Sequence, residues 1–162
     1  MKRKVAFLLY QLAKYLPDRN ATNPVISGQW FRGLFAKRFV IHLGSNVKIY
    51  QGVGLPFEIK IGSNTQIHQK SNFDVDIEIG NNVNIGHQCL FITNRRQYIG
   101  HNSPEKIVVE DDVWIGSRVI VLGGVRIGKK AVVGAGCVVS KNVPPYSLAV
   151  GNPVQIINDK YK

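Results

Sequence analysis

Hydrophobic residues recur at every sixth position through the middle of the chain. A large apolar residue opens each of fourteen six-residue slots, in two runs that begin at Leu43 and Val109 and share one phase. The openers are Leu43, Ile49, Leu55, Ile61, Ile67, Phe73, Ile79, Ile85, Val109, Ile115, Val121, Ile127, Val133 and Val139. A period of six fits neither an amphipathic helix nor a single strand, and it indicates a solenoid of stacked repeats.

Two further columns follow the same period. The fifth residue of each slot, from Val47 to Val143, is small or β-branched, as an inward-facing wall position requires. Glycine follows the opener in seven of the fourteen slots, where we expect it to permit the backbone angles of a tight corner. Asn and Asp cluster after it, as in Asn81-Asn82, which suits turns with left-handed residues. Three slots make a triangular coil of 18 residues, so the sequence predicts an all-β solenoid over about 41–145, stabilised by stacking.

The segments outside the repeat predict a cap and a tail. Residues 4–16 are typical of a helix that Pro17 ends, with an apolar stripe of Val5, Leu8, Leu9, Leu12 and Leu16. That stripe either packs on the first coil or a neighbouring subunit, or rests on an anionic bilayer through residues 2–16. Residues 18–40 carry a second apolar stripe, from Trp30 to Phe39, with Arg32, Lys37 and Arg38 expected outside. Residues 1–40 therefore form a basic amphipathic cap, and 146–162 form a tail.

Charge and composition limit where the protein acts and which partners it has. The net charge is +11, and residues 1–40 hold eight Lys/Arg against one Asp. The chain has no apolar run long enough to span a membrane. Its start imitates a signal peptide, but the apolar run is short and no cleavage site follows, so we expect a cytoplasmic protein. It carries no basic–aromatic motif of a nucleic-acid-binding module, so no nucleic-acid partner is expected.

Both cysteines occupy fifth-residue core slots. Cys89 and Cys137 are therefore expected to be small buried hydrophobes in a reducing compartment, not a disulfide.

The repeat breaks at residues 91–108. Phe91 satisfies the opener rule, but Arg95 then falls in a core slot. Because an unpaired buried Arg is costly, the chain should leave the coil here and project as a loop. Functional groups concentrate on such loops.

The chain resembles the hexapeptide-repeat acyltransferases over roughly residues 40–157. The resemblance is carried by the repeat itself, by Val113-Trp114-Ile115-Gly116-Ser117, by the segment 133–141, by Val143-Pro-Pro and by Gly151-Asn-Pro153. The most similar group is the galactoside, maltose and capsular-polysaccharide O-acetyltransferases. The resemblance implies a left-handed parallel β-helix, a homotrimer, and acetyl-CoA in the groove between neighbouring solenoids. It implies transfer of an acetyl group to a sugar or lipid-linked glycan precursor of a surface polysaccharide, with no metal.

The resemblance also implies which residues form the cofactor wall. Trp114 would flank the thioester, and Ser117 and Ala135, one coil apart, would face the pantetheine arm. Ser140 and Lys141 would lie near the phosphates, and Pro153 would pack on the adenine. The tail departs from the family pattern, because Gln155 stands where an Arg or Lys usually follows.

A second departure concerns the general base. The family's catalytic His lies in the projecting loop, whereas this chain reads Thr93-Asn94-Arg95 there. Arg95 stays protonated at neutral pH, so it can bind an anion or neutralise an oxyanion but cannot accept the proton. His101, in the loop, and His87, at a corner in the coil before it, are the candidate bases. His42 lies far from the cofactor wall, and His68 lies in an early coil.

Two other functions compete with the acetyltransferase. A catalytically impaired trimer would keep a CoA or sugar site without efficient turnover, as Arg95 suggests. A zinc carbonic-anhydrase relative would need three converging His, and the spacing of His68, His87 and His101 argues against one.

Overall fold

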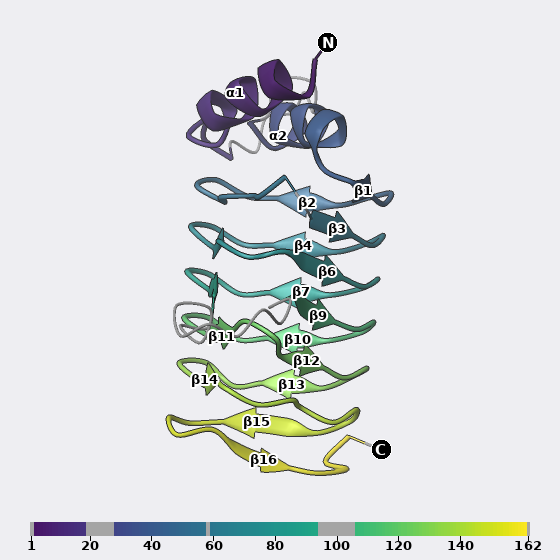
Figure 1. The fold of residues 1–162 in the computed structure, drawn as a ribbon, viewed down its shortest axis with the longest axis vertical. Coiled ribbons are helices and arrows are strands. Elements are labelled where there is room, and N and C mark those ends of the chain that lie inside the picture. The colour runs from purple at the N-terminus through teal and green to yellow at the C-terminus, as the bar shows by residue number, and fades with distance from the viewer. Residues whose placement is uncertain (1, 19–27, 58, 94–105, 162) are drawn as a thin grey trace, which may run out of the picture.

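The structure is a computed structural model, and it describes residues 2–18, 28–57, 59–93 and 106–161. Two helices lie across one end of a stack of short strands, and the C-terminus lies at the opposite end (Figure 1). No helix in these ranges is long and apolar enough to cross a membrane. The predicted fold class, an all-β solenoid with a helical N-terminal cap, is confirmed. The division at 40 and 145 stays a prediction.

Three sheets form the walls of the solenoid. The first sheet contains β1 (His42–Leu43), β3 (Ile59–Ile61), β6 (Ile77–Ile79), β9 (Ile107–Val109) and β12 (Arg126–Ile127). The second contains β2 (Lys48–Ile49), β4 (Gln66–Ile67), β7 (Asn84–Ile85), β10 (Trp114–Ile115), β13 (Val132–Val133), β15 (Leu148–Val150) and β16 (Gln155–Ile157). The third contains β5 (Asn72–Phe73), β8 (Leu90–Ile92), β11 (Ile120–Leu122) and β14 (Val138–Val139). All pairs are parallel except β15 with β16, so each strand meets the same wall of the next coil.

The opener and fifth-residue columns fill the interior, as predicted. Every opener from Ile49 to Val139 is buried, and so is every fifth residue from Val53 to Val143. Phe73 and Phe91 stack in this core, with ring centroids 4.4 Å apart. Cys89 and Cys137 are buried and unpaired, as predicted, and burial raises the pKa of both thiols.

The repeated glycines have a different role from the predicted one. None of the seven that follow an opener has a positive φ; the left-handed residues come two positions later, at residues such as Asn46, Asn64 and Asn82. A Cβ on Gly62 would lie 2.5 Å from the carbonyl carbon of Gly80 in the next coil. These glycines are therefore required by the close approach of successive coils, while Asn and Asp supply the turn, as expected.

The interruption of the repeat is a twelve-residue insertion rather than a full coil. Ile79 pairs with Val109 across the first sheet, thirty residues on, whereas Ile61 pairs with Ile79 after eighteen. The coil between β7 and β10 is therefore complete without the extra residues. The predicted projection at Arg95 and His101 falls within residues 94–105, outside the described residues.

The cap packs through a face that the helical stripe did not predict. α1 (Arg3–Ala13) buries Ala6, Tyr10 and Ala13, and the Tyr10 hydroxyl donates to the Val53 carbonyl at 2.8 Å. The predicted stripe is instead exposed: Leu8 by 64% and Leu12 by 66%. The prediction that this stripe packs on the first coil is therefore wrong. The face with Ala6, Tyr10 and Ala13 packs instead, because its small residues let the helix approach its neighbours more closely.

Arg32 on α2 (Gly28–Phe39) is completely buried, which corrects its predicted position outside the cap. Its guanidinium donates to the carbonyls of Ile49 (2.8 Å), Leu16 (2.7 Å) and Ala13 (3.2 Å). It also forms an ion pair with Asp18, whose other oxygen accepts from the Gln51 amide at 2.9 Å. One buried cation thus joins the end of α1, α2 and the first coil, and its bonds offset the cost of burying it.

We expect Gly62→Ala to lower the free energy of unfolding by about 2 kcal/mol, because the added Cβ meets backbone of the next coil. Gly33→Ala is the matched control, since a Cβ there meets nothing within 4 Å, and it should stabilise α2 by about 0.5–1 kcal/mol. Urea unfolding followed by circular dichroism measures both. Equal effects of the two variants would contradict the close-approach explanation.

We expect Arg32→Met to cost about 3 kcal/mol, because it leaves Asp18 and three carbonyl groups without their buried donor. Arg38→Met, on the exposed side of the same helix, should change stability by less than about 0.5 kcal/mol. Urea unfolding monitored by tryptophan fluorescence compares the two. A cost for Arg32→Met no greater than for Arg38→Met would show that the buried network contributes little.

Candidate functional site

One corner of the solenoid, where the second sheet turns into the third, gathers most of the predicted site residues. The openers before this corner pair in register from coil to coil: Ile67 with Ile85, Ile85 with Ile115, and Ile115 with Val133. The residues that follow them therefore lie one above another. His68, His87, Ser117 and Ala135 occupy this corner, which we call the histidine corner.

A groove runs along the histidine corner. His68, His87, Trp114, Ser117 and Ala135 line a hollow of about 330 Å³. A second hollow of about 520 Å³ continues from His87, Ser117 and Ala135 to Arg118 and Gly136. Gly86 and Gly116 also line the groove, and they let successive coils approach closely there, because a Cβ on Gly116 would lie 2.6 Å from the Ala135 nitrogen.

Trp114 forms one wall of this groove. It lies on β10 opposite Asn84 of β7, and 52% of it is exposed. An exposed tryptophan beside small corner residues offers a flat apolar surface to a ligand. Ser117 connects two successive coils at this corner, because its hydroxyl accepts a hydrogen bond from the His87 backbone N–H at 3.2 Å.

A column of stacked rings leads into the groove. Tyr50 and His68 stack with centroids 4.7 Å apart and planes at 10°, and His68 and His87 follow at 4.9 Å and 36°. Burial, and then repulsion from His87, lower the pKa of His68, while a hydrogen bond with the Asn84 side chain partly offsets both effects. Burial and the neighbouring His87 thus favour the neutral form of His68, whereas His87 is the exposed end of the column.

The other predicted cofactor residues lie at two corners of the solenoid, and only one of these corners carries the groove. Ala149 pairs with Val133, so the turn that contains Pro153 occupies the histidine corner one coil beyond Ala135. Ser140 and Lys141 follow β14 and lie at the next corner, where the third sheet turns back to the first. The single chain thus gathers His87, Trp114, Ser117, Ala135 and Pro153 along one edge, and places Ser140 and Lys141 on another.

Sequence reasoning missed that His68 belongs to this site. Tyr50 and His68 both follow an opener and are eighteen residues apart, which is one coil. Because residues one coil apart lie one above the other, that spacing predicts that the two rings stack, and it could have shown that His68 belongs to the site. Asn84 was also missed, since nothing in its position distinguishes it from other outward residues of the second sheet.

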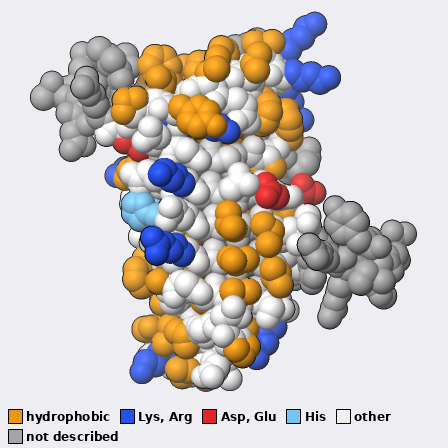
Figure 2. Space-filling view, turned by 90° about the vertical axis from the view of Figure 1, so that its left-hand side faces the viewer, with side chains coloured by type: hydrophobic (Ala, Val, Ile, Leu, Met, Phe, Trp, Pro, Cys, Tyr) orange, Lys and Arg blue, Asp and Glu red, His pale blue; other side chains and the backbone are white. Residues whose placement is uncertain are grey.

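The outer face of the third sheet is apolar next to the histidine corner. Leu90, Ile92, Ile120, Leu122 and Val138 occupy positions adjacent to the openers and point outward, and Leu90 is 38% exposed. Figure 2, which faces this side, shows hydrophobic side chains in a column below the cap. An outward apolar strip on a solenoid wall suits contact with another protein surface.

Comparison with known proteins places this chain in one family. The family described as "Bacterial transferase hexapeptide (six repeats)" matches residues 106–141. A hexapeptide-repeat acetyltransferase of Vibrio cholerae, solved with acetyl coenzyme A, is 30% identical with a TM-score of 0.76, covering 96% of this chain and 85% of that one. The chain therefore belongs to the hexapeptide-repeat acetyltransferase family.

Two sugar O-acetyltransferases are similar as well. The solved maltose O-acetyltransferase of Clostridium difficile is 27% identical with a TM-score of 0.74, covering 96% of this chain and 84% of that one. The galactoside O-acetyltransferase of Lactococcus lactis is 48% identical over 58 residues, which are 34% of this chain and 28% of that protein. The chain spans between a quarter and three tenths of the curated relatives it matches.

The position of His68 beside His87 predicts how His68 titrates with pH. We expect His68 to titrate below its usual pKa of about 6.5 in an NMR titration, and His87→Ala to raise that pKa by removing a repelling charge. Because the folded pKa is depressed, the contribution of His68 to stability is present above about pH 6.5 and is lost as pH falls through the folded pKa. His42→Ala, in another part of the molecule, is the control. A His68 pKa at or above 6.5 would contradict the burial of His68 beside His87.

Proposed function

We propose that the protein is an acetyl-CoA-dependent O-acetyltransferase whose acceptor is a sugar or polysaccharide precursor. The observation that carries this proposal is the register that stacks Trp114, Ser117, Ala135 and Pro153 along one edge, beside an open groove. Acetyl-CoA as the donor is supported by the neighbour solved with acetyl coenzyme A. A sugar as the acceptor is supported by the similar maltose and galactoside O-acetyltransferases.

In this proposal the groove holds the extended part of acetyl-CoA. Trp114 flanks the thioester, and the small corner residues Ser117 and Ala135 let the pantetheine arm approach the backbone. Pro153, one coil further, packs on the adenine. Ser140 and Lys141 lie near the phosphates, where the Lys141 ammonium acts as a point charge.

The chemistry requires a base and a stabilised oxyanion. The acceptor hydroxyl gives its proton to an imidazole as its oxygen attacks the thioester carbonyl. The tetrahedral intermediate then collapses, the C–S bond breaks, and the imidazole returns the proton to the CoA thiolate. We propose His101 as the base, with His87 as the alternative, and Arg95 as a cation that stabilises the oxyanion. His87 is the one of the three within the described residues, and it opens onto the groove.

We further propose a homotrimer. Ser140 and Lys141 lie at a different corner from Ser117, so a groove between two subunits would let one molecule of CoA meet both edges. The apolar outer face of the third sheet supports such a contact.

We propose a cytoplasmic enzyme that contacts the membrane peripherally through its basic cap. Lys2 and Lys4 flank the exposed stripe of α1, which contains no acidic residue. We propose that residues 2–16 rest on an anionic membrane surface, which suits a lipid-linked glycan acceptor in surface-polysaccharide biosynthesis.

A second candidate function is a non-catalytic member that binds CoA or sugar without efficient turnover. Arg95 at the position of the family's catalytic His favours it, because a permanently protonated side chain cannot act as the base.

A thiol-release assay with acetyl-CoA and a panel of sugars tests the enzyme. We expect turnover, and we expect His101→Ala to lower kcat by about 10²–10⁴-fold because it removes the proton acceptor. His87→Ala is measured beside it, and His42→Ala, remote from the groove, is the control that should leave kcat unchanged.

Trp114→Ala should raise the Kd for CoA about tenfold, because it removes the flat apolar wall of the groove; isothermal titration calorimetry measures this Kd.

The outcomes separate the candidates. CoA binding without turnover on any acceptor supports the non-catalytic member. Unchanged kcat in both His101→Ala and His87→Ala shows that the base lies elsewhere, and absence of CoA binding overturns both functions.

A further inference from the structure

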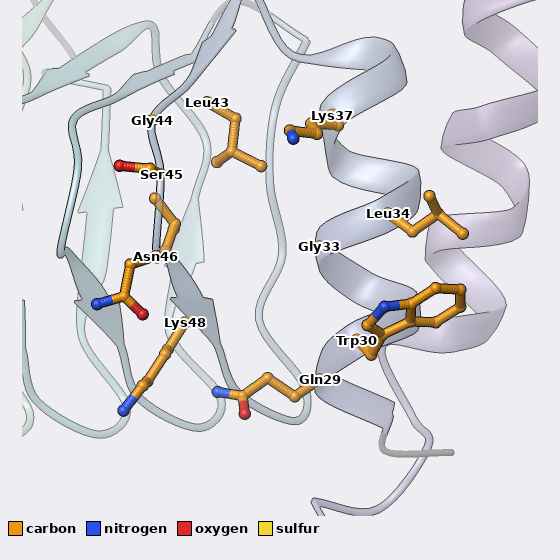
Figure 3. Close-up of a pocket in the computed structure, with 11 residues that line it drawn as sticks. Gln29, Trp30, Gly33, Leu34, Lys37, Leu43, Gly44, Ser45, Asn46 and Lys48 are labelled. Carbon is orange, nitrogen blue, oxygen red and sulfur yellow. The ribbon is translucent and has the colours of Figure 1, made fainter. Parts of the chain in front are cut away.

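A second groove lies between α2 and the first coil, away from the histidine corner. It has a volume of about 570 Å³ and is lined by Gln29, Trp30, Gly33, Leu34 and Lys37 of α2 and by residues 43–48. Figure 3 shows the α2 residues on one side and Leu43, Ser45, Asn46 and Lys48 on the other. We call it the cap groove. Nothing in the proposed transfer reaction uses it.

Gly33 keeps the cap groove open. It lies in the interior of α2, where glycine is less favourable than alanine. A glycine in a helix is explained by close packing when a Cβ would clash, but a Cβ on Gly33 would meet nothing within 4 Å. The glycine therefore has no packing reason here, and its effect is to leave space in the groove.

The cap groove combines apolar surface with hydrogen-bond donors. Trp30 is 43% and Leu34 39% exposed, so a ligand there meets uncovered hydrocarbon. The Lys37 and Lys48 ammonium groups are exposed, and none of the described residues that line the groove is a carboxylate. The side-chain nitrogen of Gln29 is buried and, within the described part of the chain, has no hydrogen-bond partner. An unpaired buried donor costs free energy unless something accepts its hydrogen bond.

We propose that the cap groove binds an anionic amphiphile, a hydrocarbon chain that ends in a phosphate. The chain lies against Trp30, Leu34 and the open space at Gly33. The phosphate accepts from Lys48 and Gln29, whose side-chain ends lie at one end of the groove, or from Lys37 at the other (Figure 3). The two lysines in a described lining that holds no carboxylate favour an anion, and the apolar part of that lining favours a hydrocarbon chain over a free ion.

This site is distinct from the bilayer contact proposed for α1. The stripe of Leu8 and Leu12 is convex and exposed, whereas the cap groove is a concave site that takes one molecule. The proposal does not depend on transferase activity, since binding is measured without acetyl-CoA.

Dodecyl phosphate below its micelle concentration is the probe. The chain contains two tryptophans, so Trp114→Phe leaves Trp30 as the sole reporter in the full-length protein. We expect a saturable blue shift with one molecule bound per chain, and a Kd at least tenfold weaker for dodecyltrimethylammonium and for inorganic phosphate. Gly33→Leu should weaken dodecyl phosphate binding at least tenfold, because its side chain occupies the groove, and circular dichroism checks that it is folded.

The charge is tested with two matched double variants. Lys37→Ala with Lys48→Ala should weaken binding at least tenfold, while Lys2→Ala with Lys4→Ala removes the same charge from α1 and should change the Kd less than twofold. Equal weakening in both pairs would show non-specific attraction and overturn the site. Unchanged affinity in a folded Gly33→Leu, equal affinity for inorganic phosphate, or no saturable binding would each overturn it as well.

Discussion

Each coil of this solenoid is hydrogen-bonded to the next at one fixed register, and the rest of the structure depends on that constraint. Ile67, Ile85, Ile115 and Val133 form one continuous column because each pairs with the next across the second sheet. The register fills the core with one apolar residue per slot. It also brings the corners so close that a Cβ on several repeat glycines would touch the neighbouring backbone.

The candidate site is a consequence of the same register. Small residues at successive corners leave a groove, and residues that are eighteen or thirty residues apart become neighbours. The twelve-residue insertion is accommodated between β8 and β9 without disturbing this stacking, so loop chemistry can vary while the wall that carries Trp114 and Ser117 stays fixed.

The helical cap follows different rules, and prediction from sequence was weaker there. α1 has two adjoining apolar faces, and hydrophobic spacing cannot tell which of them packs; the face with Ala6, Tyr10 and Ala13 does, because small residues allow closer contact. Arg32 is buried only because carbonyl groups from α1 and the first coil converge on it. The periodicity of α2 gave no indication of those partners.

The sequence by itself determined the solenoid, its core columns and the identity of the residues at each corner, because a six-residue period admits one way of stacking. It also located Trp114, Ser117 and Ala135, which the family motifs mark. Only the tertiary structure decided that the His68 ring lies against His87, that Arg32 is buried among carbonyl groups, and that α1 exposes its leucines. These features depend on contacts between segments far apart in the chain, and local patterns do not encode which groups will meet.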